Sequence, residues 1–172
     1  FDMGIVPVPS QQFSLRDFKE NIKNNIVFVS VSVEKEIGNF QVAFKAHEKG
    51  DYKTALEQFK VLAEQGDAGA QFNLGQMYDK GQGVPQDYQE AVKWYRLSAE
   101  QGNAEAQLNL GLMYNNGLGV SQDYVSAHMW FNLCGSSGDK DCVSSIRHIE
   151  KMMSPSQIEK AQEMARNWKP KK

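Results

Sequence analysis

The sequence repeats itself with a period of 36 residues, and this period limits the folds that the chain can adopt. When residues 51–86 are aligned with residues 87–122, 19 of the 36 positions are identical. The stretch "DAGAQFNLGQMYDKGQGVPQDY" begins at Asp67, and "NAEAQLNLGLMYNNGLGVSQDY" begins at Asn103. Repeats of about 20 to 50 residues bury their apolar faces against their neighbours. The period therefore predicts a stack of similar units.

Each repeat has the pattern of two helices. Asp87 stands at an N-cap position with Glu90 three residues later, and Gly102 stands where a helix ends. The apolar positions in both segments recur at the spacing of one helical face. These positions are Tyr88, Ala91, Val92, Tyr95 and Ala99 in the first segment, and Ala106, Leu110, Met113 and Tyr114 in the second. The pattern predicts antiparallel helical hairpins.

The hairpins are joined by glycine-containing loops, "GQGVPQ" and "GLGVSQ". Gly81, Gly83, Gly117 and Gly119 are placed where we expect positive φ angles. A phosphate-binding loop is not favoured, because the pattern follows a helix, lacks a third glycine and contains no Gly-Lys-Ser/Thr.

The stretches "AEAQLNLGLMYNNGLGVSQDY" and "DYQEAVKWYRLSAEQG" resemble the Sel-one-like repeat family, a relative of the tetratricopeptide repeat. The resemblance extends over about residues 40–168. It implies an all-α fold, an α/α solenoid of about four hairpins within residues 39–168. The hairpins are expected at about residues 39–65, 67–101, 103–137 and 139–168. Ser154–Gln157 has the pattern of a capping box, which predicts a final helix that covers the end of the stack.

Residues 1–38 do not follow the repeat. Their apolar run "IVFVSVSV" follows Lys19 and Lys23, as in an export signal, but Glu34 and Glu36 make a poor cleavage region. A leader remnant, a β-strand and a loosely ordered extension are three alternatives for this segment. An exported or periplasmic location is slightly favoured over a cytoplasmic one.

The charge balance argues against nucleic acid as a partner. The chain has 19 basic and 21 acidic residues, which gives no basic surface of the kind that binds phosphate backbones. No apolar run reaches the length of about 18 residues that a membrane helix requires. We expect no transmembrane segment and no cofactor.

Cys134 and Cys142 stand eight residues apart. The family resemblance implies a disulfide, because cysteine-rich members join neighbouring helices at this spacing. Here, however, both cysteines stand one position earlier than in those members. Cys142 takes the place of Ala70 and Ala106, which favours a buried free thiol. A disulfide and two free thiols both remain open.

No metal site or catalytic centre is predicted. His128 and His148 each stand six residues from a cysteine, a step of about 240° around a helix, so neither histidine shares a face with its cysteine. Ser137 and Lys140 form an S-x-x-K string. The Ser-Asp-Asn and Lys-Thr-Gly partners of penicillin-recognising enzymes are not in the sequence. We therefore do not expect an enzyme.

The resemblance implies a concave face lined by one helix of each hairpin. Asn73 and Asn109 match the asparagine with which tetratricopeptide repeats bond a peptide backbone, although they can equally hold neighbouring helices together. Phe72, Leu108 and Leu112 are either core residues or exposed anchors. The predicted partner-binding residues are Phe44, His47, Phe72, Asn73, Gln76, Leu108, Asn109 and Leu112.

These residues predict a protein-interaction module that binds a protein or peptide on its concave face. One alternative is a structural or envelope-associated protein without a ligand in the groove. A second alternative, which the missing motifs disfavour, is a β-lactam-recognising hydrolase.

Overall fold

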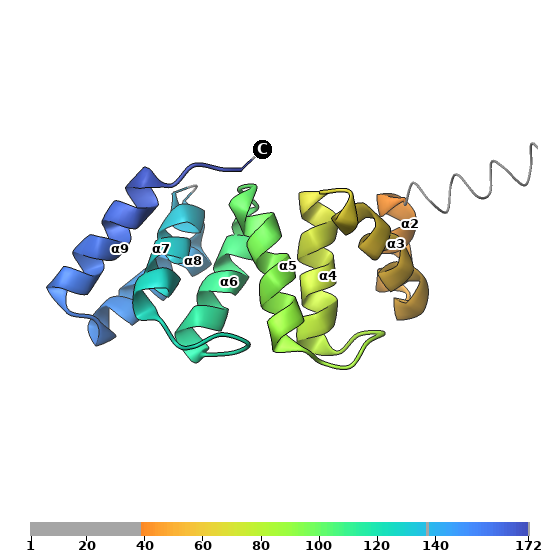
Figure 1. Cartoon of the computed structure of the whole chain (residues 1–172), viewed down its shortest axis with the longest axis horizontal. Helices are drawn as coiled ribbons and strands as arrows, with labels where there is room; N and C mark the ends of the chain where they lie inside the picture. The colour runs from red at the N-terminus through yellow and green to blue at the C-terminus, as the bar shows by residue number, and fades with distance from the viewer. Residues whose placement is uncertain (1–38, 137, 172) are drawn as a thin grey trace, which may run out of the picture. The chain divides into compact units, whose positions relative to one another are not determined.

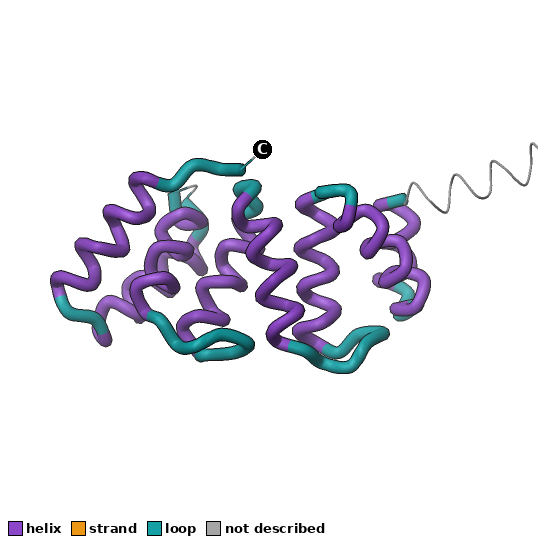
Figure 2. The backbone as a smooth tube through the Cα atoms, in the orientation of Figure 1, coloured by secondary structure: helices purple, strands orange, loops and turns teal. Residues whose placement is uncertain are grey.

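The computed structural model describes residues 39–136 and 138–171, and within these ranges every regular element is a helix (Figures 1 and 2). The all-α repeat fold predicted from the sequence is confirmed. The candidate strand at 26–33, like the rest of the 1–38 extension, lies outside the described residues. The helices are α2 (Phe40–Glu48), α3 (Tyr52–Glu64), α4 (Ala68–Lys80), α5 (Tyr88–Glu100), α6 (Ala104–Asn116), α7 (Tyr124–Gly135), α8 (Lys140–Ile149), the 3-10 turn η1 (Glu150–Met152) and α9 (Pro155–Asn167).

The helices begin and end at the capping residues of the sequence. Asp87 accepts hydrogen bonds from the backbone N–H groups of Gln89 and Glu90 at the start of α5. Equivalent Asp or Asn side chains cap α2, α3, α4, α6, α7 and α8. At the other ends of α4 and α6, Gly81 and Gly117 adopt the left-handed conformation with φ of 67° and 68°, as expected for residues without a Cβ atom.

Each helix from α2 to α7 packs against the next one in the chain, so that the helices lie side by side (Figure 1). Small residues allow the close approach. A Cβ atom at Gly75 would lie 2.7 Å from Cδ1 of Tyr95, and one at Gly111 would lie 2.5 Å from Cε1 of Phe131. Tyr95 and Phe131 are buried at these contacts. The glycines therefore set the distance between α4 and α5 and between α6 and α7.

The C-terminal end of the stack is built differently. α8 and α9 both pack against α7 and have little contact with each other. The exposed Arg147 occupies the position that Gly75 and Gly111 hold in the preceding units, so the small residue that allows a close helix approach in those units is absent here.

The last helix begins and ends with specific contacts. Ser154 and Gln157 form the capping box predicted from the sequence. After α9, Trp168 packs edge-on against Trp130 with ring centroids 6.5 Å apart. The tail then runs back toward the turn between α5 and α6 (Figure 1), where the Lys171 backbone N–H donates to the Glu100 carbonyl at 2.7 Å.

Candidate functional site

The predicted partner-binding residues lie on α2, α4 and α6. Together with α8, these helices are called here the inner row. Phe44 on α2 and Leu112 on α6 are 43% and 39% exposed, so they are surface residues. Phe72, Gln76 and Leu108 are half-buried. The choice between core and surface, which the sequence left open, thus has different answers along the row.

The N-terminal part of the row is aromatic. Phe44 stacks on Phe40 with ring centroids 6.5 Å apart. The His47 ring lies edge-on to Tyr52 at 5.4 Å, and its Nε2 atom is 2.9 Å from Oε1 of Gln82. This contact fixes the histidine against the first long loop.

The two predicted asparagines have partners within the protein. Nδ2 of Asn73 donates to the Gly69 carbonyl at 2.8 Å within α4. The Asn109 side chain lies beside the Tyr95 hydroxyl and acts to lower its pKa, and that hydroxyl donates to Oδ2 of Asp79 at 3.2 Å. Burial, followed by the charge of Asp79, raises the pKa of Tyr95 well above its usual value. Tyr95 is therefore a stable donor that links α4 to α5.

A hollow of about 400 Å³ opens between α6, α7 and α8. Leu112 is the one member of its lining that belongs to the predicted binding set. Asn115 and His148 lie on the inner row but were not predicted as binding residues. The sequence signal that could have identified the hollow is the presence of Ser144 and Ser145 where the preceding unit has the larger residues Leu108 and Asn109. The lining residues are Leu112, Asn115, Phe131, Ser144, Ser145 and His148.

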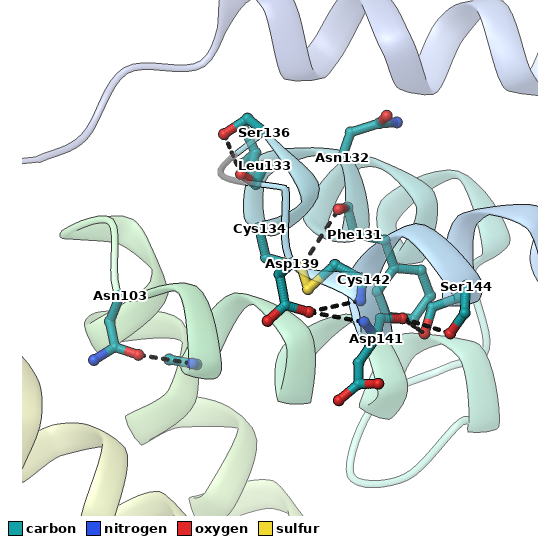
Figure 3. Close-up of a disulfide and its surroundings, with 12 residues drawn as sticks. Asn103, Phe131, Asn132, Leu133, Cys134, Ser136, Asp139, Asp141, Cys142 and Ser144 are labelled. Atoms are coloured by element: carbon teal, nitrogen blue, oxygen red, sulfur yellow. Dashed lines mark hydrogen bonds between the residues drawn. A yellow bond between two sulfur atoms is a disulfide. The ribbon is translucent and has the colours of Figure 1, made fainter.

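A disulfide between Cys134 and Cys142 joins the end of α7 to the start of α8 (Figure 3). The sulfur atoms are 2.07 Å apart and the Cα atoms 6.0 Å apart. This is the alternative that the alignment had favoured less. Cys142 lies at the buried position of Ala70 and Ala106, as expected, but the first turn of α8 also brings it next to Cys134. Asp139 fixes that turn by accepting from the backbone N–H groups of Asp141 and Cys142.

The histidines near the cysteines have other roles. His128 is fully buried, with Nε2 3.1 Å from Oε1 of Glu150 and Nδ1 2.6 Å from Nδ2 of Asn132. His148 is exposed at the hollow. Both cysteine sulfurs are held in the disulfide. Across residues 39–136 and 138–171, no three His, Cys, Asp or Glu side chains gather in a metal-binding group.

Two further features bear on the predicted classes of function. Lys140 of the S-x-x-K string is the exposed first residue of α8, whereas Ser137 lies outside the described residues. Among the helices that the structure describes, none combines the length and the apolar character needed to cross a membrane.

Comparisons with known proteins agree with the geometry. The Sel1 repeat model matches residues 68–103 and 104–139. The search of curated proteins found no match. Solved structures that are similar in fold include the following two. One is a protective antigen present in uropathogenic Escherichia coli strains and displaying an SLR fold, with a TM-score of 0.72 and 32% identity over 74% of this chain. The other is a Sel1 repeat protein from Oxalobacter formigenes, with a TM-score of 0.63 and 26% identity over 76% of this chain.

The present chain spans only 28% of the length of the first protein and 56% of the second. The shared part is the stack of helical repeats. The chain therefore carries two Sel1 repeats within a solenoid of the Sel1-repeat fold.

Proposed function

We propose that this solenoid is a protein-interaction module that binds a partner protein or peptide along the inner row. The main observation is the exposure of Phe44 and Leu112, at 43% and 39%, on helices whose other large apolar residues are buried or half-buried apart from Val42. Exposed apolar side chains on a rigid scaffold are suited to act as binding anchors. The residues proposed to contact the partner are Phe44, His47, Phe72, Asn73, Gln76, Leu108, Asn109 and Leu112.

The asparagines keep part of their bonding capacity. An amide side chain carries two N–H donors and an accepting oxygen. The bond from Asn73 to the Gly69 carbonyl uses one donor, and the remaining groups suit the alternating donors and acceptors of an extended main chain. We propose that they add to the binding supplied by the apolar anchors.

The role proposed is binding and not catalysis. The inner row offers amide, aromatic and aliphatic side chains, which recognise a partner by shape and hydrogen bonding. The disulfide supports an exported or periplasmic location for this module, because disulfides persist in oxidising compartments.

A comparison of two sets of alanine variants tests the proposal. Phe44→Ala and Leu112→Ala remove exposed anchors from the inner row. Leu97→Ala and Met164→Ala remove side chains of similar exposure from α5 and α9 and serve as matched controls. Partners are captured from the source cell with the wild-type protein, and their affinities for each variant are measured by titration calorimetry.

The proposal expects the inner-row changes to weaken binding by about 1 to 2 kcal/mol each and the control changes to have little effect. Loss of binding in the control set alone would move the site to α5 and α9. If no protein bound the wild type above background, a structural role without a groove ligand would be the better description.

A further inference from the structure

The Asp79–Tyr95 pair has a counterpart 36 residues later in which the donor is missing. The equivalent residues are Asn115 and Phe131. Phe131 has no hydroxyl group to donate. Within the part of the chain that the structure describes, Oδ1 of Asn115 is buried and has no hydrogen-bond partner. Buried polar atoms are nearly always paired, so an unpaired acceptor here requires an explanation.

The same register explains the hollow beside Asn115. In the preceding unit, Leu108 and Asn109 occupy this place. Leu108 packs against the core, and Asn109 lies beside the Tyr95 hydroxyl. Ser144 and Ser145 stand at the equivalent positions of α8. Both replacements shorten the side chain, and the space between α6, α7 and α8 is left as the hollow of about 400 Å³.

The polar wall of the hollow presents acceptors. Ser144 and Ser145 both donate their single hydroxyl hydrogen to the Asp141 carbonyl, at 2.9 and 2.8 Å (Figure 3 shows the Ser144 bond). Their oxygen lone pairs remain able to accept. Asn115 uses an Nδ2 hydrogen on Oδ1 of Asn116 at 2.9 Å. His148 and the second Nδ2 hydrogen of Asn115 add donors to the lining. The acceptors of Ser144, Ser145 and Asn115 outnumber these donors, so the wall favours a ligand that donates a hydrogen bond.

The remaining lining restricts the ligand further. Phe131 and Leu112 give the hollow an apolar side. The six lining residues include no carboxylate, so a cationic donor would enter without a counter-charge, which is unfavourable. The volume is within the range of about 300 to 1,000 Å³ that is usual for small-ligand pockets. A neutral aromatic group with one O–H or N–H donor meets all these conditions.

We propose that the hollow is an anchor pocket for a tyrosine or tryptophan side chain of the partner protein, an inference that rests on the proposed function. The aromatic ring packs against Phe131 and Leu112. Its single O–H or N–H hydrogen donates to one of the acceptors of Ser144, Ser145 or Asn115. Rotation of the Asn115 amide toward the ligand gives up only the exposed bond to Asn116.

The test uses small molecules that carry the side-chain chemistry without the partner. The ¹⁵N-labelled protein is titrated with 4-methylphenol and 3-methylindole, and with 4-methylanisole as the matched control that has a similar ring but no donor. With 4-methylphenol and 3-methylindole, we expect saturable changes in the NMR chemical shifts of the backbone amides of residues 112, 131, 144 and 145. We expect 4-methylanisole to bind about fivefold more weakly, as for one lost hydrogen bond.

Two variants restore the side chains of the preceding unit. Ser144→Leu places the equivalent of Leu108 in the hollow, and Ser145→Asn places the equivalent of Asn109 there. Each should reduce probe binding at least tenfold while the far-UV circular dichroism is unchanged. Ser156→Leu, a similar change at an exposed position of α9, is the control. Because Ser145→Asn adds no apolar bulk, it remains a valid test if Ser144→Leu does not fold.

Three results would overturn the proposal. They are equal binding of 4-methylphenol and 4-methylanisole, undiminished binding by folded Ser145→Asn, and chemical-shift changes confined to a different hollow, such as the one between α7 and α9 around Met129 and Trp168. The probes also separate this inference from the proposed function. If the probes bind but no protein partner can be captured, the pocket is supported and the interaction module is refuted. If a partner is captured and binds Ser145→Asn as tightly as the wild type, the interaction module is supported and the pocket is refuted as its anchor.

Discussion

The replacement of Gly75 by alanine tests the packing that determines the spacing of the repeat helices. The added Cβ atom would lie 2.7 Å from Cδ1 and 2.9 Å from Cε1 of Tyr95, whereas carbon atoms in contact are usually about 3.5 to 4.0 Å apart. The Tyr95 ring must therefore move by about 1 Å. It is fully buried and its hydroxyl is bonded to Asp79, so the movement also disturbs that hydrogen bond.

The expected magnitude follows from three opposing terms. Alanine gains about 1 kcal/mol over glycine in helix propensity. Overpacking costs about 1 to 3 kcal/mol, and the loss of the Tyr95 hydrogen bond costs about 1 kcal/mol. The free energy of unfolding should therefore fall by about 1 to 3 kcal/mol. Urea unfolding followed by circular dichroism measures this change, provided that the slope of the transition is unaltered.

Gly69→Ala is the matched control on the same helix. Its Cβ atom would lie 3.1 Å from the nearest ring carbon of Phe40, which is only half-buried and can shift slightly. We expect this variant to have a stability within about 0.5 kcal/mol of the wild type. If Gly75→Ala were as stable as Gly69→Ala, the close approach of α4 and α5 would not depend on a glycine, and the packing argument would be wrong.

Two further predictions concern the disulfide and the helix caps. Replacing both Cys134 and Cys142 by alanine should lower the free energy of unfolding by roughly 2.5 kcal/mol for a bridge between residues eight apart; calorimetry measures the loss, and unchanged stability would refute it. The pKa values of Asp51 and Asp123 are both lowered. For Asp51 the main cause is the hydrogen bonds from Thr54. For Asp123 burial is the largest single effect and raises the pKa, but the hydrogen bonds from Ser126 and Val125 and the charge of Lys160 together outweigh it. The stabilisation from these two carboxylates is complete above the unfolded pKa of about 4 and disappears as the pH falls through the lower folded pKa values. In Asp123→Asn, the loss of stability between about pH 4 and 2, measured by urea titration, should therefore be smaller than in the wild type. An unaltered acid profile would exclude a stabilising role for the Asp123 carboxylate.

The regular part of the fold could be predicted because each repeat unit contains its own helix-capping and helix-packing residues. The positions of Asp87 and Gly117 mark helix ends, and the pairing of Gly111 with Phe131 recurs from Gly75 and Tyr95. Because these residues recur with a period of 36, the helix ends and contacts of one unit predict those of the next. The segment 1–38 has no such period, and the alternatives for it stay predictions.

The site was less predictable, because exposure depends on neighbours that the sequence does not identify. Phe44 and Leu112 are exposed, whereas Phe72 and Leu108, with the same apolar character, are half-buried. The ring centroids of Phe72 and Tyr95 are 6.0 Å apart. Predicting this contact requires the relative positions of α4 and α5. The disulfide likewise depends on how the turn after α7 places Cys142.

The departures of the last unit from the repeat are of two kinds. Arg147 stands in place of a glycine and no glycine loop precedes α9, and here α9 packs against α7 and not against α8. This change in helix packing does not require Ser144, Ser145 or Phe131, because larger side chains that filled the interior of the unit would add stability. These residues instead remove volume and a hydroxyl donor on the side of the inner row. The change that opens the hollow is thus separate from the change in how α8 and α9 pack, and this separation is why the hollow is better explained by a ligand than by the different packing of these helices.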